Sequence, residues 1–118
     1  MNTYLVTDAA KQDFKAVLKE TKDLFGPRQR AVYKSLISEG VKMVAEEPTR
    51  GGSWDRGVVV PGLRAFHLEH VAGRSGAASH MLYYAVEHRS DGSQRVVILR
   101  LLHESMEPRL HIARTGGP

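Results

Sequence analysis

The sequence predicts an α+β domain in the order β-α-α-β-β-β, with an N-terminal helical hairpin packed on a mainly antiparallel sheet. Two observations predict this fold. Apolar residues recur at helical spacing over two consecutive segments near the N-terminus. The rest of the chain alternates β-branched or aromatic runs with turns rich in Gly, Ser and Asp. Because the connections between these later strands are short, we expect an antiparallel meander.

Length and composition limit the class of protein. The 118 residues fit one domain, expected over 1–118, with a disordered tail over about 113–118. The chain contains no cysteine, which excludes disulfides and thiolate metal sites. We find no signal peptide and no apolar run near the roughly 20 residues that cross a membrane. We therefore expect a cytoplasmic protein without a membrane partner. Its net charge of +4 favours polyanions or an acidic partner, but does not by itself indicate nucleic-acid binding.

The N-terminal third is expected to form a strand and the first helix of the hairpin. Thr3–Thr7 is β-branched and aromatic, and Asp8 is expected to be the N-cap of the helix that follows. Gly26 and Pro27 are expected to end this helix and begin the next one. The apolar face of the first helix comprises Phe14, Val17, Leu18, Leu24 and Phe25.

The second helix has the clearer pattern. Its apolar positions are Tyr33, Leu36, Ile37, Val41, Val44 and Ala45. Gly40 lies on the same face and is expected to allow close packing. Pro48 predicts that the helix ends at Glu46 or Glu47. Two amphipathic helices with so short a break predict an antiparallel hairpin that needs an apolar surface, and only a sheet remains to supply one.

The segment Thr49–Gly57 is a loop by composition and contains the only tryptophan, Trp54. Two interpretations of this residue remain open. Beside Arg50 and Arg56 it could stack on a nucleic-acid base. Alternatively it folds back to cap the helical hairpin, which is the interpretation we favour.

Three later segments are expected to be strands. Leu63–Val71 alternates loosely, with Phe66 and Leu68 on one face, and His80–Val86 alternates more strictly. Gln94–His103 is a dense aliphatic run of the kind buried on both faces of a sheet. It nevertheless carries Arg100 and ends on a histidine. In a central strand such side chains usually have a partner or a use.

We expect neither a metal nor a cofactor. His67 and His70 would point to opposite faces of a strand, and their spacing does not match the helical zinc motif. In addition, no Gly-rich phosphate loop follows a strand and precedes a helix.

Polar side chains on the last three strands offer one candidate for chemistry. On the sheet face opposite the helices they would form a cationic groove suited to metal-free RNA cleavage, with a base, an acid and arginines for the phosphate. From residue types alone we favour the alternative that they cap strand ends or pair with acidic groups of a partner. The candidates are Arg64, His80, Tyr83 or Tyr84, Arg100 and His103.

Several segments between Tyr4 and His111 resemble the ParE branch of the RelE/ParE superfamily of type II toxins, once described as plasmid-stabilisation proteins. The sequence departs from the family pattern at two places. Glu107 stands where the family usually has Asp, and Glu69–Ala77 resembles an insertion between two strands that the family usually joins more tightly. The matching segments are Tyr4–Ala10 followed by Asp13, Arg64 at the head of its strand, Ser79–Tyr84 and Val97–Glu107.

The resemblance implies a toxin that is neutralised by an acidic, partly disordered antitoxin similar to ParD. Two mechanisms occur on this fold: ParE-type toxins poison DNA gyrase by binding it, whereas RelE-type toxins cleave mRNA on the ribosome. The lysine-free segment Val58–Val71 favours the first mechanism. The alternatives are an mRNA interferase and a non-toxic member that acts only in antitoxin binding and autoregulation.

The resemblance also divides the candidate site residues into two sets. For a gyrase inhibitor, the expected contacts with target or antitoxin are Tyr83, Tyr84, Met106, Glu107, Arg109 and His111. For a nuclease only, the expected catalytic residues are His103, Arg100, Arg64 and His80.

Overall fold

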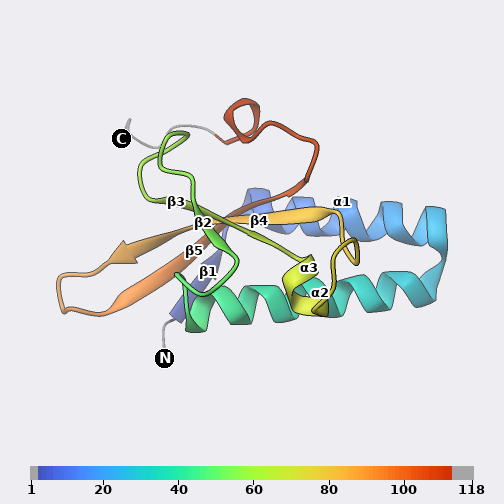
Figure 1. The fold of residues 1–118 in the computed structure, drawn as a ribbon, viewed down its shortest axis with the longest axis horizontal. Helices are drawn as coiled ribbons and strands as arrows, with labels where there is room; N and C mark the ends of the chain where they lie inside the picture. The colour runs from blue at the N-terminus through green and yellow to red at the C-terminus, as the bar shows by residue number, and fades with distance from the viewer. Residues whose placement is uncertain (1–2, 113–118) are drawn as a thin grey trace.

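The fold is α+β, as predicted: two long helices pack on a five-stranded sheet (Figure 1). It was determined as a computed structural model that describes residues 3–112. The predicted disorder of residues 113–118 therefore lies outside the described residues. In chain order the elements are β1 Thr3–Val6, α1 Asp8–Phe25, α2 Pro27–Glu46, β2 Ser53–Asp55, β3 Leu63–His67, α3 Glu69–Ala72, β4 His80–His88, β5 Gln94–His103 and the 3-10 helix η1 Pro108–Leu110.

The sheet is mainly antiparallel, in the strand order β1-β5-β4-β3-β2. Strand β1 runs parallel to β5, and the other neighbours pair antiparallel. The ladder between β4 and β5 shifts by one residue next to Tyr83, which pairs with Arg100 while Tyr84 pairs with Ile98. The extra residue, Leu99, makes this a β-bulge.

The N-cap of α1 is Thr7, so the prediction of Asp8 was wrong. The Thr7 hydroxyl accepts the backbone N–H of Ala10 and donates to the carbonyl of Leu99, both at 3.1 Å. Asp8 is instead the first helical residue, where its carboxylate still faces the positive end of the helix dipole. Thr7 is the cap because its hydroxyl makes two hydrogen bonds at once. It accepts from the first turn of α1, and it donates to the Leu99 carbonyl of β5, beyond the end of β1.

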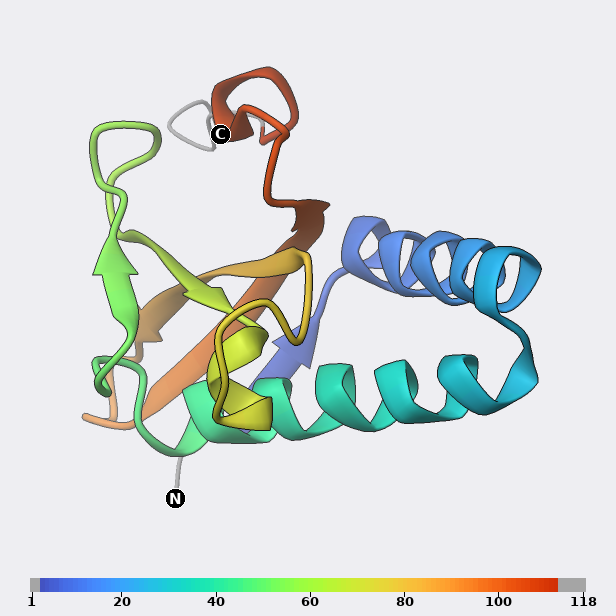
Figure 2. The same ribbon diagram turned by 45° about the vertical axis from the view of Figure 1, so that its right-hand side comes forward.

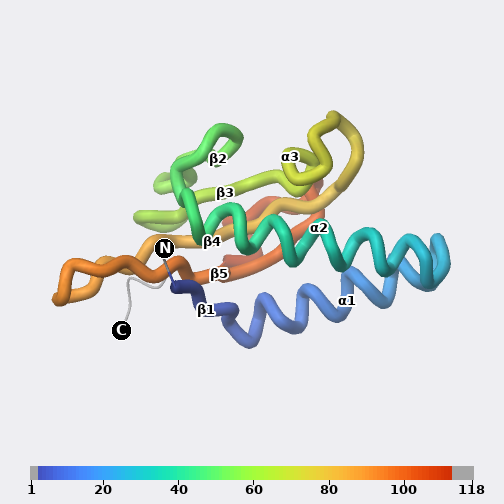
Figure 3. The backbone as a smooth tube through the Cα atoms, turned by 90° about the horizontal axis from the view of Figure 1, so that it is seen from below, coloured from blue at the N-terminus to red at the C-terminus, as the bar shows by residue number. Residues whose placement is uncertain are grey.

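The helical hairpin covers one face of the sheet, where the larger part of the core is found (Figure 2). The break at Gly26 and Pro27 occurs as predicted, and Gly26 has φ 92°, which favours glycine. Helices α1 and α2 run side by side, and β1 leads directly into α1 (Figure 3). The buried residues of this core are Ala10, Leu18, Ile37, Val41, Val44, Phe66, Leu68, Ala78, Leu82, Tyr84, Val96, Ile98 and Leu101.

Two elements differ from the prediction. Residues Ser53–Asp55 of the expected loop form the edge strand β2, which pairs antiparallel with β3. Strand β3 ends at His67, and α3 follows at Glu69–Ala72, so the predicted strand over Leu63–Val71 was too long. The backbone turns here because Leu68 has helical dihedral angles and buries its side chain beneath α2.

The opposite face of the sheet, called the open face below, carries a smaller apolar cluster. The β2–β3 loop and the C-terminal segment after β5 project on this side of the sheet (Figure 2). Among the residues described, no helix is long and apolar enough to span a membrane. The buried members of the cluster are Val59, Val60, Leu63, Ala65, Met81, Tyr83, Leu102 and Ile112.

Candidate functional site

The residues proposed for a catalytic groove are divided between several places in the fold. Strand β4 alternates, so Leu82 and Tyr84 face the helices whereas Met81 and Tyr83 face the open side. Arg64 pairs across the sheet with Tyr84, on the helix side. The structure therefore does not gather the predicted set on the open face.

Arg64 has a structural role beneath the end of α2. Its Nε donates to the Ser53 hydroxyl at 2.8 Å, and that hydroxyl lies 2.6 Å from the Tyr84 hydroxyl. The Tyr84 hydroxyl in turn donates to the carbonyl of Pro48. This network attaches β2 to the sheet and to the chain after α2. Since Tyr84 is fully buried, it offers no surface to a partner.

Arg100 joins α1, β5 and the C-terminal segment. Its Nε and a terminal nitrogen donate to the two carboxylate oxygens of Asp13, at 2.6 and 3.0 Å. Another nitrogen donates to the carbonyl of His111 at 2.6 Å. Asp13 also accepts the backbone N–H of Leu101 at 3.0 Å. This bond gives a partner to a β5 backbone group that lies past the end of β1. We call this network the arginine clamp.

His80 and His103 meet at one end of the sheet, with ring centroids 5.4 Å apart and nearly perpendicular planes. His80 Nδ1 shares a 2.5 Å hydrogen bond with the hydroxyl of Tyr33, which also accepts the backbone N–H of Ser79. Burial first, and then the neighbouring His103, lower the pKa of His80 to about 4. His80 is therefore neutral at pH 7.

His67 lies beside this pair on the adjacent strand. Its Nδ1 accepts the backbone N–H of Glu69, so its proton is on Nε2, which donates to Glu104 at 2.7 Å. This hydrogen bond lowers the pKa of the Glu104 carboxyl. In the part of the chain that the structure describes, no three acidic or histidine side chains are placed to hold a metal ion.

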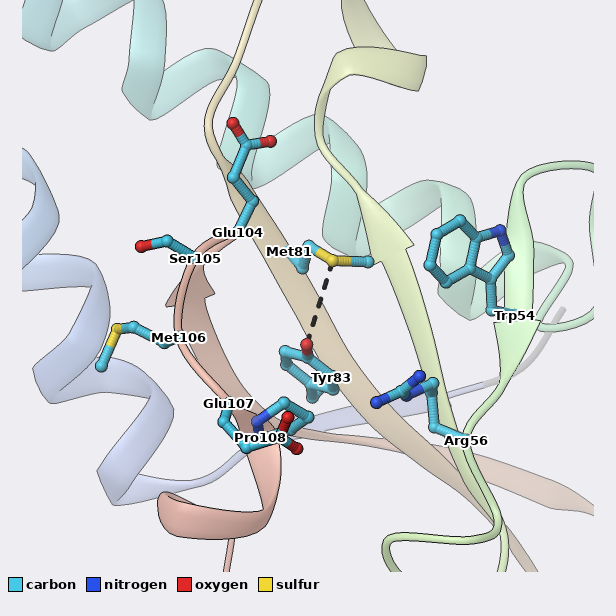
Figure 4. Close-up of a pocket in the computed structure, with 9 residues that line it drawn as sticks. All are labelled: Trp54, Arg56, Met81, Tyr83, Glu104, Ser105, Met106, Glu107 and Pro108. Carbon is cyan, nitrogen blue, oxygen red and sulfur yellow. Dashed lines mark hydrogen bonds between the residues drawn. The ribbon is translucent and has the colours of Figure 1, made fainter.

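The open face holds a pocket of about 260 Å³ (Figure 4). Met81 and Tyr83 form its floor, and Trp54 and Arg56 stand on one side (Figure 4). Its opposite wall is the C-terminal segment, residues 104–108. Trp54 is 56% exposed, so the favoured interpretation that it caps the helical hairpin was wrong. We call this the open-face pocket.

Three of the predicted contact residues line this pocket, namely Tyr83, Met106 and Glu107, and two continue past it. Met106 and Glu107 belong to its wall, and Glu107 accepts the backbone N–H of Arg109 at 3.2 Å. Arg109 is exposed, and the carbonyl of His111 is held by the arginine clamp. The clamp thus fixes the segment that forms one wall of the pocket.

Sequence reasoning assigned no positioning role to three residues that hold these groups in place: Asp13, Tyr33 and Ser53. A signal existed only for Asp13, which lies three residues after Ala10 and four before Val17, on the buried face of α1. A carboxylate there needs a cationic partner, and Arg100 needs an anionic one. Tyr33 and Ser53 gave no such signal, because a tyrosine and a serine are common on helices and in loops.

Comparison with known proteins assigns the chain to a family. Residues 4–108 match the model of the ParE toxin of the type II toxin–antitoxin system, parDE. The chain belongs to the ParE toxin family. It is 29% identical over 112 residues to Toxin ParE1 of Caulobacter vibrioides, which covers 95% of this chain and 99% of that protein.

The fold agrees with this assignment. A solved structure described as the chromosomal ParDE toxin–antitoxin system from P. aeruginosa superimposes with a TM-score of 0.66 at 21% identity. The match covers 87% of this chain and 96% of the solved chain. The chain is thus a ParE toxin of a type II toxin–antitoxin system, as the sequence resemblance implied.

Proposed function

We propose that this ParE toxin poisons DNA gyrase by binding it through the open face and the C-terminal segment. The observation that carries the proposal is the exposure of apolar side chains on the two segments that contribute Arg56 and Pro108 to the open-face pocket. Val58 in the β2–β3 loop is 72% exposed, and Leu110 in η1 is 80% exposed. Exposed apolar side chains on two segments that flank one pocket are typical of a protein-binding surface.

The hydrogen bonds of the two strand arginines also favour binding without catalysis. Arg64 and Arg100 donate their hydrogen bonds inside the protein, to Ser53, Asp13 and the carbonyl of His111. Neither guanidinium is therefore available as a phosphate clamp without disrupting packing. Tyr83, Met106, Glu107, Arg109 and His111 remain our proposed contacts for the target.

We further propose that an acidic, partly disordered antitoxin neutralises the toxin in the cytoplasm. The chain carries a net charge of +4, which favours an acidic partner. A groove of about 290 Å³ between α1, α2 and β1 is mostly apolar, with Phe14, Leu18 and Ile37 in its wall and Lys34 beside them. An amphipathic helix with acidic flanks suits such a groove. The solved neighbour from P. aeruginosa is itself described as a ParDE system.

The purified toxin tests the proposal in two parallel assays. One measures gyrase supercoiling and trapped cleaved DNA, and the other measures mRNA cleavage on translating ribosomes. We expect loss of supercoiling with cleaved DNA trapped, and intact mRNA. mRNA cuts with unaffected gyrase would overturn the proposal. Silence in both assays would also overturn it, and would leave a protein that acts only in antitoxin binding and autoregulation.

The second candidate, an mRNA interferase, is favoured by one observation. His80 is neutral at pH 7 and lies beside His103 at the mouth of a pocket of about 420 Å³ between the hairpin and residues 76–80. A neutral imidazole next to a second one could serve as base and acid. Under this candidate, both His80→Ala and His103→Ala would abolish ribosome-dependent cleavage.

A further inference from the structure

The open-face pocket has more hydrogen-bond acceptors than its neighbours use. Glu104 and Glu107 each accept through one carboxylate oxygen, from His67 and from a backbone N–H. Among the residues described, the other oxygen of each carboxylate accepts no hydrogen bond. Tyr83 is only 4% exposed, and its hydroxyl donates to the sulfur of Met81 but accepts nothing from the described part of the chain. A ligand that completes this pocket must therefore bring donors.

The pocket is negative in a chain that is positive. Its lining holds two carboxylates and one guanidinium, that of Arg56, whereas the whole chain has a net charge of +4. His67 does not neutralise Glu104, because its Nδ1 accepts a backbone N–H and the ring is therefore neutral. The ligand that suits these acceptors is thus a cation.

The uncompensated negative charge is that of Glu104. Burial raises the pKa of the Tyr83 hydroxyl, while Arg56 lowers this pKa and Glu107 raises it, so both charges act on the same hydroxyl and offset one another. Arg56 and Glu107 lie toward one end of the pocket, whereas Glu104 and Trp54 lie toward the other (Figure 4). A cation is therefore favoured at the end that holds Glu104 and Trp54.

The register of the sheet leaves an aromatic wall uncovered at this end. Trp54 pairs with Ala65, which pairs with Tyr83, so the three residues lie in a row across β2, β3 and β4. The alanine in the middle extends only to its Cβ and leaves a hollow between the two rings. The Trp54 side chain is 56% exposed, so a ligand can reach it. A planar guanidinium stacks on an indole and carries five N–H donors.

We propose that the open-face pocket binds an arginine side chain of the partner protein. The guanidinium stacks on Trp54 and donates to the free oxygen of Glu104, while its aliphatic stem contacts Met81 and Met106. Lysine fits less well, because its ammonium is a point charge that cannot lie flat on the indole while it donates. The inference rests on the proposed function for the identity of the partner, which is the target that the open face binds.

The sequence makes the stacking directly measurable. Trp54 is the only tryptophan of the chain, so intrinsic tryptophan fluorescence reports this pocket alone. We would titrate the full chain with the blocked peptide Ala-Arg-Leu-Ala and with counterparts that carry citrulline or glutamate in place of arginine. Citrulline has the shape of arginine without its charge. We expect a saturable change with the arginine peptide at up to about 10 mM, and binding about tenfold weaker for the citrulline peptide.

Two carboxylate variants separate this contact from general charge. Glu104→Gln keeps an acceptor for His67 but removes the charge, and it should weaken binding of the arginine peptide about fivefold, as for an ion pair that water reaches. Glu87→Gln is the matched control, because its side chain is 48% exposed, against 50% for Glu104, and lies in the β4–β5 hairpin. It should leave binding unchanged.

The guanidinium of the lining gives a test of sign. Arg56→Gln removes a positive charge from the pocket, so it should tighten binding of the arginine peptide. A site for an anion would instead lose affinity in this variant.

A further comparison isolates the ring. With a labelled arginine peptide, anisotropy should show Trp54→Phe binding within a few-fold of the parent chain, whereas Trp54→Ala should bind about fivefold more weakly. Thermal unfolding checks that each variant is folded.

Three results would overturn the inference: no saturable change with the arginine peptide, equal or tighter binding of the citrulline or glutamate peptide, or equal effects of Glu104→Gln and Glu87→Gln. None of these titrations contains gyrase. Absence of peptide binding in a chain that inhibits gyrase would overturn the pocket inference alone, and peptide binding by a chain that does not inhibit gyrase would overturn the proposed function alone.

Discussion

Arg100 connects three parts of the chain through one guanidinium. It reaches Asp13 of α1 and the carbonyl of His111, while its backbone belongs to β5. The side chains of Arg100 and Asp13 are only 25% and 15% exposed, so water screens the pair weakly. The arginine found in the family-like segment Val97–Glu107 therefore stabilises this fold.

Removing the clamp should destabilise the protein. We expect Arg100→Gln and Asp13→Asn each to lower the free energy of unfolding by about 2–3 kcal/mol, because each leaves a charged partner of the pair without its hydrogen bonds. Urea denaturation of both single variants and the double variant measures this. The double variant should lose clearly less free energy of unfolding than the sum of the losses of the two single variants.

The exposed pair of Arg95 and Glu87 is the control for this cycle. Its side chains are 32% and 48% exposed, and Arg95→Gln should cost no more than about 1 kcal/mol. An equal cost for Arg95→Gln and Arg100→Gln would contradict a structural role of the clamp.

His80 should make stability depend on pH. Its pKa is about 4 in the folded protein and about 6.5 in an unfolded chain, so the unfolded chain binds more protons between these values. Stability is therefore fully present above pH 6.5 and falls as the pH is lowered toward 4. Thermal unfolding at pH 7 and pH 5 should show a smaller loss for His80→Gln than for the parent chain.

His88→Gln, at the exposed end of the same strand, is the control for removal of an imidazole. The pKa of the Glu104 carboxyl is also lowered, chiefly by the hydrogen bond from His67, and both chains retain this group. If His80→Gln and the parent chain lose the same stability between pH 7 and 5, the buried neutral histidine is not the cause.

At the scale of elements, the helices could be predicted because their apolar spacing is local in the sequence. Gly40 illustrates this, since its predicted close packing is confirmed. A Cβ at this position would lie 2.8 Å from Leu68 Cδ2 and 3.2 Å from Leu82 Cδ1. Both leucines are fully buried. The glycine thus lets α2 approach the sheet.

Gly40→Ala should test this contact. Alanine is the better helix former by about 1 kcal/mol, but overpacking costs about 1–3 kcal/mol, so we expect net destabilisation. Chemical denaturation of the variant measures the difference. Gly51→Ala is the control, since nothing lies within 4 Å of its position, and it should change stability by less than about 0.5 kcal/mol. A stabilised Gly40→Ala variant would show that the leucines move aside.

The elements that could not be predicted depend on distant partners. Strand β2 has only three residues and no alternation, and it exists because Ser53 and Asp55 pair with β3. The end of β3 at His67 is equally non-local, since Leu68 turns away to bury under α2. The observed site differs from the predicted one for the same reason. The partner of Arg100 lies 87 residues away in the sequence, and Trp54 lies on the open face instead of against the hairpin.

At the scale of the whole molecule, the two faces of the sheet have different roles. The helix face holds the larger core and the bonds of Arg64, whereas the open face holds a small cluster, a pocket and the exposed residues Val58 and Leu110. His103, at the end of β5, lines a different pocket, between the hairpin and residues 76–80. A binding toxin and a nuclease therefore place their essential residues in different regions of the same chain.

The most direct test of the account is gyrase supercoiling with three purified chains: the parent, a Val58→Ser and Leu110→Ser double variant, and His103→Ala. Both serines replace highly exposed side chains, so the fold should be retained. The account predicts that the double variant inhibits gyrase at least about tenfold more weakly, while His103→Ala inhibits as the parent does. Full inhibition by the double variant together with loss of inhibition in His103→Ala would contradict it.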